Sequence, residues 1–138
     1  MERLDYIART DGRLTVSGAP PGFDAYLAAE AATRRGDTIL FVAIDDAHAD
    51  ALAAGIKFFA PGVRVLPFPA WDCLPYDRVS PKPDTESRRL ATLAALARAN
   101  AGPAVVVTTI NAMLQRVPPR DVIATASFQA RVNQDVDR

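Results

Sequence analysis

Apolar and polar positions follow two patterns along this chain, and each pattern predicts a different element. Two runs, 38–44 (TILFVAI) and 104–108 (AVVVT), are apolar throughout, which is typical of parallel strands covered by helices on both faces. A shorter apolar run at 63–66 predicts another strand, and Leu14–Val16 predicts a short first one. The segments between them place apolar residues at helical spacing and predict helices over about 24–35, 45–60, 84–100 and 110–116.

Residues that begin and end helices stand at the borders of these helical segments. Gly36 ends the first helix, Asp45-Asp46 begins the second, and Asp84 is the expected N-cap of the third. The stripe expected to face inward in the third helix is Leu90, Leu93, Ala94 and Ala97. Alternating strands and helices predict an α/β fold, with a parallel sheet of about four strands flanked by helices and joined by right-handed crossovers.

The C-terminal segment has a different pattern. Residues 127–132 alternate polar and apolar, as in a half-exposed strand, and no partner strand follows. A length of 138 residues is enough for one domain with a substantial core. We therefore expect 1–124 to be the first half of an α/β domain and 125–138 to be the opening strand of a second, truncated domain.

Charge and cysteine content narrow the class of protein. Lys+Arg and Asp+Glu are equal at 16 each, which argues against a domain that holds nucleic acid by bulk electrostatics. The one cysteine, Cys73, can form neither an intrachain disulfide nor a zinc site, and the only histidine, His48, lies in another predicted helix. A single thiol, a charged N-terminus and the lack of a long apolar run predict a cytoplasmic location without membrane contact.

The turn before the first helix stands where a nucleotide-binding α/β domain has its phosphate loop. Ser17, Gly18 and Gly22 resemble the framework of such a loop, although two prolines between the glycines remove N–H donors. Phe23 and Asp24 occupy the place of the lysine and the hydroxyl residue, and Asp24 would repel phosphate. We therefore expect a degenerate loop without a Walker A or B motif. No catalytic, cofactor-binding or metal-binding residue is predicted in this chain.

The segment from Trp71 to Leu90, WDCLPYDRVSPKPDTESRRL, is the most distinctive part of the sequence. It is too aromatic for a passive linker and too rich in proline for a helix or a central strand. Because it follows a strand, we place it at the carboxyl edge of the sheet, where open sheets bind ligands and partners. Trp71 and Tyr76 either anchor a partner or fold back as a lid over the end of the sheet.

Three blocks of sequence together resemble one family. They are LPFPAWDCLPYDRVSP at 66–81, followed by Asp84; SRRLATLAAL at 87–96; and VVVTTINAMLQRVPP at 105–119. Over about residues 13–133 the chain is similar to the N-terminal UvrB-like module of the bacterial transcription-repair coupling factors (Mfd). That module resembles a helicase domain without a working Walker motif, which fits the degenerate loop at 17–24.

The resemblance implies a role in DNA repair. Members of the family release RNA polymerase stalled at DNA lesions with an ATP- and magnesium-dependent translocase, and they recruit nucleotide excision repair by binding UvrA. Their UvrB-like module contacts UvrA chiefly through a small domain that follows the segment present here, and it helps to hold the free protein in an autoinhibited state. The implied function of this chain is a non-catalytic scaffold that contacts UvrA and other domains of the same protein. ATP, magnesium, RNA polymerase and DNA are implied for the full-length family only.

Two other functions stay open. A nucleotide-binding α/β enzyme domain would require the loop at 17–24 to hold phosphate. A DNA-binding fragment of the UvrB type would require the long tyrosine-rich hairpin that UvrB places near 71–84. This segment is too short for such a hairpin and the chain is neutral, so DNA clamping is not carried over.

The candidate partner surface combines aromatic and basic residues. Its members are Trp71, Tyr76, Arg88, Arg116, Arg120, Phe128 and Arg131. Phe128 and Arg131 lie in the predicted edge strand, which can present side chains or backbone to UvrA. In the alternative reading, one of Arg88 and Arg89 is solvated and the other pairs with Asp77 or Asp84. Arg116 and Arg120 are then ordinary exposed charges.

Overall fold

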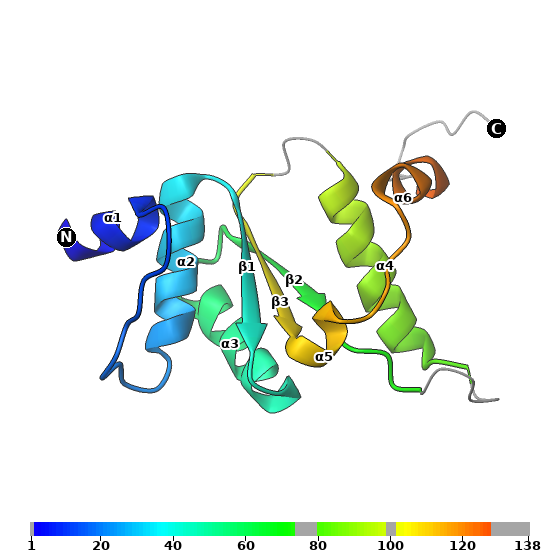
Figure 1. Cartoon of the computed structure of the whole chain (residues 1–138), viewed down its shortest axis with the longest axis horizontal. Helices are drawn as coiled ribbons and strands as arrows, with labels where there is room; N and C mark the ends of the chain where they lie inside the picture. The colour runs from blue at the N-terminus through cyan, green and yellow to red at the C-terminus, as the bar shows by residue number, and fades with distance from the viewer. Residues whose placement is uncertain (1, 74–79, 99–101, 128–138) are drawn as a thin grey trace.

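A computed structural model describes residues 2–73, 80–98 and 102–127. The elements in chain order are α1 (Glu2–Arg9), α2 (Phe23–Arg35), β1 (Thr38–Ala43), α3 (Asp46–Phe59), β2 (Arg64–Phe68), α4 (Pro83–Ala97), β3 (Ala104–Thr109), α5 (Ile110–Met113) and α6 (Arg120–Ala126). Figure 1 shows them arranged as an α/β domain around a central sheet. None of the helices in this part of the chain is long and apolar enough to cross a membrane.

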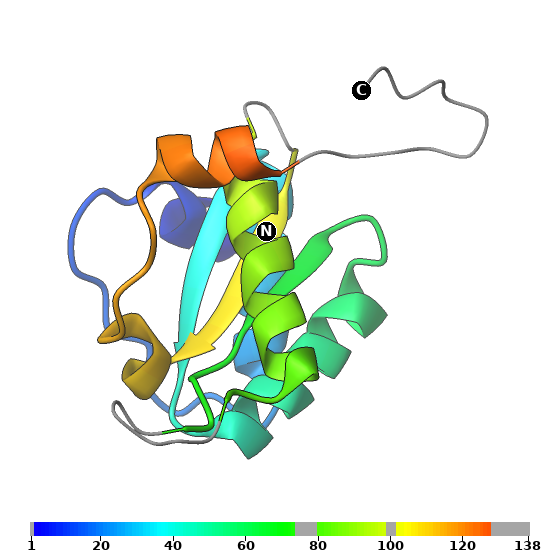
Figure 2. The same ribbon diagram turned by 90° about the vertical axis from the view of Figure 1, so that its right-hand side faces the viewer.

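The sheet is parallel, with strand order β1-β3-β2. The central strand β3, AVVVTT, is buried along its whole length, as its run of apolar residues predicts. Helices α2 and α3 cover one face, and α4 covers the other face over β2, with α6 packed against α4 (Figures 1 and 2). The predicted α/β fold with a parallel, helix-flanked sheet is confirmed.

Small side chains determine how closely α2 and α3 approach each other. The inward face of α2 consists of alanines that are almost inaccessible to solvent, Ala25, Ala28, Ala29 and Ala32. They pack with Leu52 and Ile56 of α3 and with the central strand. At Gly55 of α3, an added Cβ would stand 2.6 Å from the Cβ of Ala25, which is closer than two carbons can approach. Gly55 is therefore required for this close packing.

We expect Gly55→Ala to destabilise the protein by roughly 1–3 kcal/mol, the usual cost of overpacking a core. This loss opposes a gain in helix propensity of about 1 kcal/mol, so the sign of the change tests the packing. Chemical denaturation measures it. Gly62→Ala is the matched control, because a Cβ there meets nothing within 4 Å. An increase in stability for Gly55→Ala would contradict the close approach of α2 and α3.

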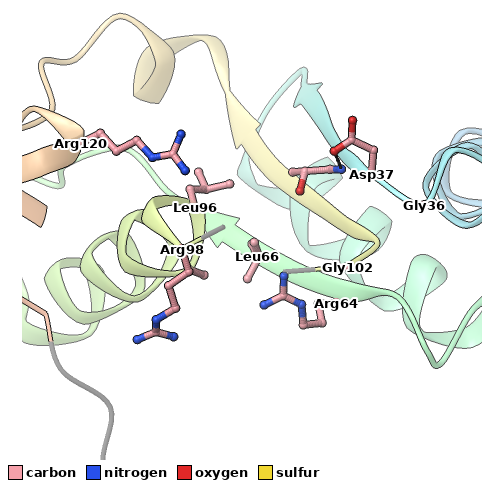
Figure 3. A pocket seen from close by; sticks show the side chains of 10 residues that line it. Gly36, Asp37, Arg64, Leu66, Leu96, Arg98, Gly102 and Arg120 are labelled. Carbon is pink, nitrogen blue, oxygen red and sulfur yellow. Dashed lines mark hydrogen bonds between the residues drawn. The ribbon is translucent and has the colours of Figure 1, made fainter. Parts of the chain in front are cut away.

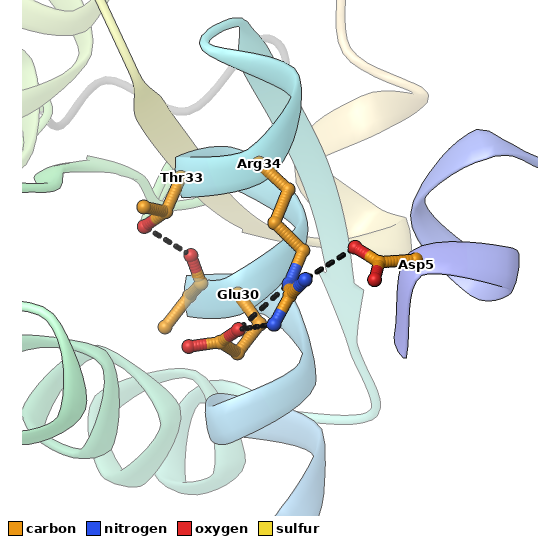
Figure 4. Close-up of polar contacts among 5 residues, drawn as sticks. Asp5, Glu30, Thr33 and Arg34 are labelled. Atoms are coloured by element: carbon orange, nitrogen blue, oxygen red, sulfur yellow. Dashed lines mark hydrogen bonds and ion pairs between the residues drawn. The ribbon is translucent and has the colours of Figure 1, made fainter. Parts of the chain in front are cut away.

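The N-terminal helix α1, which the sequence pattern does not predict, is held against the end of α2. Arg34 contacts both Asp5 of α1 and Glu30 of its own helix (Figure 4). Arg35 donates from Nη1 to the carbonyl oxygen of Ala8 at 2.7 Å. Only Ala8 of α1 is fully buried among the side chains that the structure describes in this helix. Polar contacts therefore hold α1 more than apolar burial does.

Two predictions about the sheet are wrong. Leu14–Val16 forms no strand, and both apolar residues are largely exposed, so the described part of the chain contains three strands rather than about four. Three residues form too few backbone hydrogen bonds to hold a strand at the edge of the sheet. The run at 38–44 is covered on one face only, since Leu40 and Val42 are exposed on the face opposite α2 and α3.

The third predicted helix differs from expectation at its start and in its buried face. Its N-cap is Lys82 with Pro83 in the first turn, so Asp84 lies inside the helix instead of capping it. Leu90 is 46% exposed, whereas Arg89, Thr92 and Ala95 are buried. The buried stripe is therefore shifted by one residue from the apolar stripe, because an arginine occupies the most buried position of the helix.

The C-terminal segment is described only up to Ser127. Thr125 lies inside α6, and Ser127 has extended backbone. Apart from Ser127, the strand predicted at 127–132 lies outside the described residues, as do Tyr76, Phe128 and Arg131. The boundary near Thr125 and the second domain stay predictions.

Candidate functional site

The distinctive loop after β2 is anchored by one buried cation, Arg89 of α4. Its side chain is 1% exposed. The Cζ atom lies 4.1 Å from the centroid of the Phe68 ring and 4.4 Å from the centroid of the Trp71 ring. A planar guanidinium can stack on aromatic faces and still donate from its edge, which an ammonium cannot do. Trp71 is thus folded back onto the end of the sheet, in the manner of a lid.

Hydrogen bonds complete this cluster. Nη1 of Arg89 donates to the carbonyl oxygen of Pro69 at 2.6 Å and to Oε1 of Gln115 at 3.1 Å. The same Gln115 oxygen accepts from the backbone N–H of Trp71 at 2.9 Å. We call Phe68, Trp71, Arg89 and Gln115 the Arg89 cluster. It joins three segments that are far apart in the sequence: the loop after β2, helix α4 and the turn after α5.

Two threonines extend the same attachment toward the sheet. Thr92 donates from Oγ1 to the carbonyl oxygen of Pro67 at 2.7 Å, and Thr108 donates to that of Phe68 at 2.8 Å. Both side chains are buried, so the hydrogen bonds satisfy groups that would otherwise be costly to bury. The exit of β2 is therefore fixed from both α4 and β3.

Burial lowers the pKa of Arg89. An arginine nevertheless keeps its proton at neutral pH, because its ordinary pKa is far above this range. Among the described residues it has no carboxylate partner, and its Nε makes no hydrogen bond. Among these residues, two aromatic faces, one amide oxygen and one carbonyl oxygen surround its charge. Arg88 pairs with Asp84 at 2.9 Å, as expected for one of the two arginines. Arg89 is buried and not solvated, and its other expected partner, Asp77, lies outside the described residues.

We expect Arg89→Ala to destabilise the protein by about 2–4 kcal/mol, since it leaves a cavity at a buried position and removes a donor from two partly buried oxygens. Arg88→Ala is the matched control and should change stability by less than about 0.5 kcal/mol, as for other exposed i,i+4 pairs. Urea unfolding measures both. The fluorescence of Trp71, the only tryptophan, should shift to the red in Arg89→Ala alone. Equal stability of the two variants would refute the anchoring role of Arg89.

The loop at 17–24 carries different chemistry from a phosphate loop. Gly18 and Gly22 have positive φ, 72° and 83°, as a glycine-rich turn requires. No strand precedes the loop, and Ser17 is exposed. At the start of α2, Oδ2 of Asp24 lies 2.6 Å from Nε2 of His48. The position expected for a phosphate ligand is therefore occupied by a carboxylate that bonds within the protein.

His48 links this carboxylate to the end of β1. Its Nδ1 accepts from the backbone N–H of Ile44 at 3.3 Å, which places the proton of the neutral ring on Nε2, facing Asp24. Its backbone N–H donates to the N-cap side chain of Asp45 at 2.7 Å. Burial by itself raises the pKa of Asp24, but hydrogen bonds from His48 and from the N–H of Ala25 outweigh it and leave the pKa below its ordinary value.

The lowered pKa of Asp24 has a defined consequence for stability. Because the folded pKa lies below the unfolded value of about 3.9, Asp24 stabilises the fold above about pH 4, and this contribution is lost as the pH falls further. We expect Asp24→Asn to lower the free energy of unfolding near neutral pH, with a difference from the parent that shrinks below about pH 4. Denaturation across this pH range tests it, with exposed Asp50→Asn as the control. A difference that is constant with pH would contradict this role of the carboxylate.

A hollow of about 190 Å³ lies at the carboxyl edge of the sheet. It is lined by Asp46 and Asp50 of α3, by Arg88, and by Thr108 and Thr109 at the end of β3, among others. Open α/β sheets bind nucleotides at this edge, but two carboxylates disfavour a phosphate. Within the described residues, no three His, Cys, Asp or Glu side chains gather in a way that could hold a metal ion.

The remaining candidate partner residues are spread over the surface. Arg116 is exposed, and Arg120 donates to the carbonyl oxygen of Ala97, at 3.2 Å from Nη2 and 3.4 Å from Nε. Trp71 contacts Arg89 in the middle of α4, whereas Arg120 contacts the last residue of the helix, about 12 Å further along its axis. The described candidates therefore do not form one compact patch.

Sequence reasoning missed the structural residues of this region. The sequence predicts Arg89 only as a solvated or ion-paired charge, and it predicts no role for Gln115 or Thr92. Their spacing could have revealed the buried face of α4. Arg89, Thr92 and Ala95 are three residues apart, so they lie on one side of the helix.

The fold and the site together define an open parallel α/β domain. The start of the loop after β2 packs against α4 and the turn after α5 of the same domain. Comparison with known proteins gives the family. The chain is 38% identical over 106 residues to the transcription-repair-coupling factor of Myxococcus xanthus, a match that covers 72% of this chain and 9% of that protein. The relatives from Mycobacterium bovis and Escherichia coli are 38% and 32% identical, and the matches cover 72% and 83% of the chain.

These matches place the chain in the transcription-repair-coupling factor family, as a homologue of one part of those proteins. The chain spans about a tenth of the length of the curated relatives it matches. No family model matches the sequence.

Proposed function

We propose that this chain is a non-catalytic scaffold: the first half of a UvrB-like module in a transcription-repair-coupling factor. The observation that carries the proposal is the Arg89 cluster. Trp71, Arg89 and Gln115 come from the three sequence blocks of the family resemblance, and they contact each other to fix the loop after β2. These residues of the family resemblance thus hold the loop after β2 in place, which supports a structural role and not a catalytic one.

The loop before α2 supports the same proposal. A phosphate-binding turn presents free N–H groups and a lysine to the ligand. Here Asp24 occupies the first turn of α2 and is bonded to His48, while Asp46 and Asp50 line the nearby carboxyl edge. This negative charge disfavours ATP. ATP and magnesium are therefore proposed to bind elsewhere in the full-length protein, as are DNA and RNA polymerase.

Contacts with other domains of the same protein are the second part of the proposal. Leu40 and Val42 of β1 are 55% and 41% exposed, and α5 at the end of the neighbouring strand exposes Ile110 and Met113. A strand with apolar residues on both faces is typical of a covered strand. Further segments of the longer protein would cover this face. The single cysteine keeps the cytoplasm as the proposed location.

UvrA is proposed to bind chiefly to the domain that begins near residue 125. The test is a pull-down of purified UvrA with two baits, this chain and the same protein extended by about 100 residues, a typical small-domain increment. We expect only the longer bait to retain UvrA. Retention by the short chain would move the contact into the present residues, and an Arg116→Glu variant would then test the exposed basic surface. If neither bait binds, the UvrA part of the proposal fails.

The alternative function is a nucleotide-binding enzyme domain, and titration with ATP separates it from the scaffold. We expect no saturable binding at micromolar ATP and no magnesium-dependent hydrolysis by this chain. Either activity would favour the enzyme and overturn the scaffold, and Asp24→Asn, which removes a charge that repels phosphate, should then strengthen it. The variant matters because it shows whether the loop at 17–24 is responsible.

A further inference from the structure

The opposite end of the sheet, where the strands begin, contains a second hollow with different chemistry. Its volume is about 290 Å³. Three arginines from separate elements line it: Arg64 at the start of β2, Arg98 after α4, and Arg120 at the start of α6. Figure 3 shows their side chains spread around the hollow. Within the described part of the chain, none of the three lies within ion-pair distance of a carboxylate.

The floor of this hollow includes two leucines, Leu66 of β2 and Leu96 of α4, and Leu96 is 37% exposed. Figure 3 places both leucines among the arginine side chains. One carboxylate, Asp37, lies at the edge on β1, where its Oδ1 accepts the backbone N–H of Thr38 at 2.7 Å. Three arginines, one carboxylate and two leucines thus line the hollow, so cations outnumber anions there.

The three arginines are not equivalent. Arg120 donates to the carbonyl oxygen of Ala97, so part of its role is to cap the C-terminus of α4. Arg98 follows the same helix end, where a cation complements the helix dipole. Arg64 makes no side-chain hydrogen bond among the described residues, and local structure does not explain its charge. It is therefore the residue whose charge most clearly points to a partner.

We infer that this hollow binds an acidic segment of a partner polypeptide. Carboxylates of the segment would pair with Arg64, Arg98 and the free N–H groups of Arg120, and an apolar side chain would cover Leu66 and Leu96. A peptide fits better than a nucleic acid, because the leucine floor offers nothing to phosphates and the chain has no basic excess. This proposal is separate from the proposed UvrA contact, and it does not depend on UvrA binding.

Titration of the ¹⁵N-labelled chain by NMR tests the inference. The probe is a pentapeptide with one leucine between two pairs of glutamates, and matched probes replace the leucine by glycine or the glutamates by lysines. We expect the amide signals of Thr38, Arg64 and Gly102 to shift with the first probe. The glycine probe should bind several-fold more weakly, and the lysine probe should not bind. Shifts located elsewhere, or equal for the leucine and glycine probes, would overturn the proposed site.

Charge reversal supplies the second measurement. Arg64→Glu should weaken binding of the leucine probe roughly tenfold, since it replaces an ion pair by a repulsion. Arg13→Glu is the matched control, because Arg13 is exposed and does not line the hollow. Both variants should unfold at the same urea concentration as the parent. Equal effects on binding would mean that the probe senses only net charge, which contradicts a site.

Competition distinguishes a peptide from other anions. Inorganic phosphate and a five-nucleotide oligothymidine are titrated against the same labelled chain. We expect neither to shift the three amide signals at concentrations where the leucine probe saturates. Tighter binding of the oligonucleotide at these signals would replace the acidic peptide by a nucleic acid and overturn the inference.

Discussion

The burial of Arg89 is the interaction on which the arrangement of this domain depends. A buried cation is expensive unless its surroundings supply aromatic faces and oxygen atoms at fixed positions. The end of β2 and the loop after it do so through Phe68, Pro69 and Trp71, and the turn after α5 does so through Gln115. A loop rich in proline cannot be held by strand pairing or by helix formation. The guanidinium of Arg89 can hold the loop instead, because it is planar and donates hydrogen bonds in several directions.

This dependence explains why the family resemblance is concentrated where it is. The three blocks at 66–81, 87–96 and 105–119 are separated in sequence, but their members meet at one end of the sheet. Thr92 and Thr108 lie in two of these blocks and bind the carbonyl oxygens of the third. The constraint acts on all three blocks at once, since a change in one leaves buried polar groups unpaired in the others. The three sequence blocks therefore belong together because their residues pack against and hydrogen-bond to one another.

Periodicity predicted the sheet and the main helices because these elements depend on local patterns. The strands β1 and β3 are mostly apolar, and α2 and α3 end at Gly36 and near Pro61, as the sequence indicates. It failed where burial does not follow hydrophobicity. Arg89 is polar yet buried, and Leu90 beside it is apolar yet exposed, so no apolar stripe could place α4 correctly. The Asp24–His48 pair joins residues 24 positions apart, and periodicity does not detect such a contact. Helix α1 is held by ion pairs, which periodicity does not detect either.

Helix dipoles give a physical account of the charge distribution. In a parallel α/β domain, the helices that connect the strands begin at the carboxyl edge, and their partly positive N-termini favour an anion there. Here α2, α3 and α4 all carry acidic residues in their first turns, including Asp24, Asp46 and Asp84. The protein's own carboxylates thus supply the negative charge that a nucleotide phosphate would otherwise bring. At the other edge, Arg98 and Arg120 complement the C-terminus of α4, and Arg64 adds a cation that no helix end requires. A chain with zero net charge is therefore polarised along its strands, and the edge that attracts anions is the one where open sheets do not bind nucleotides.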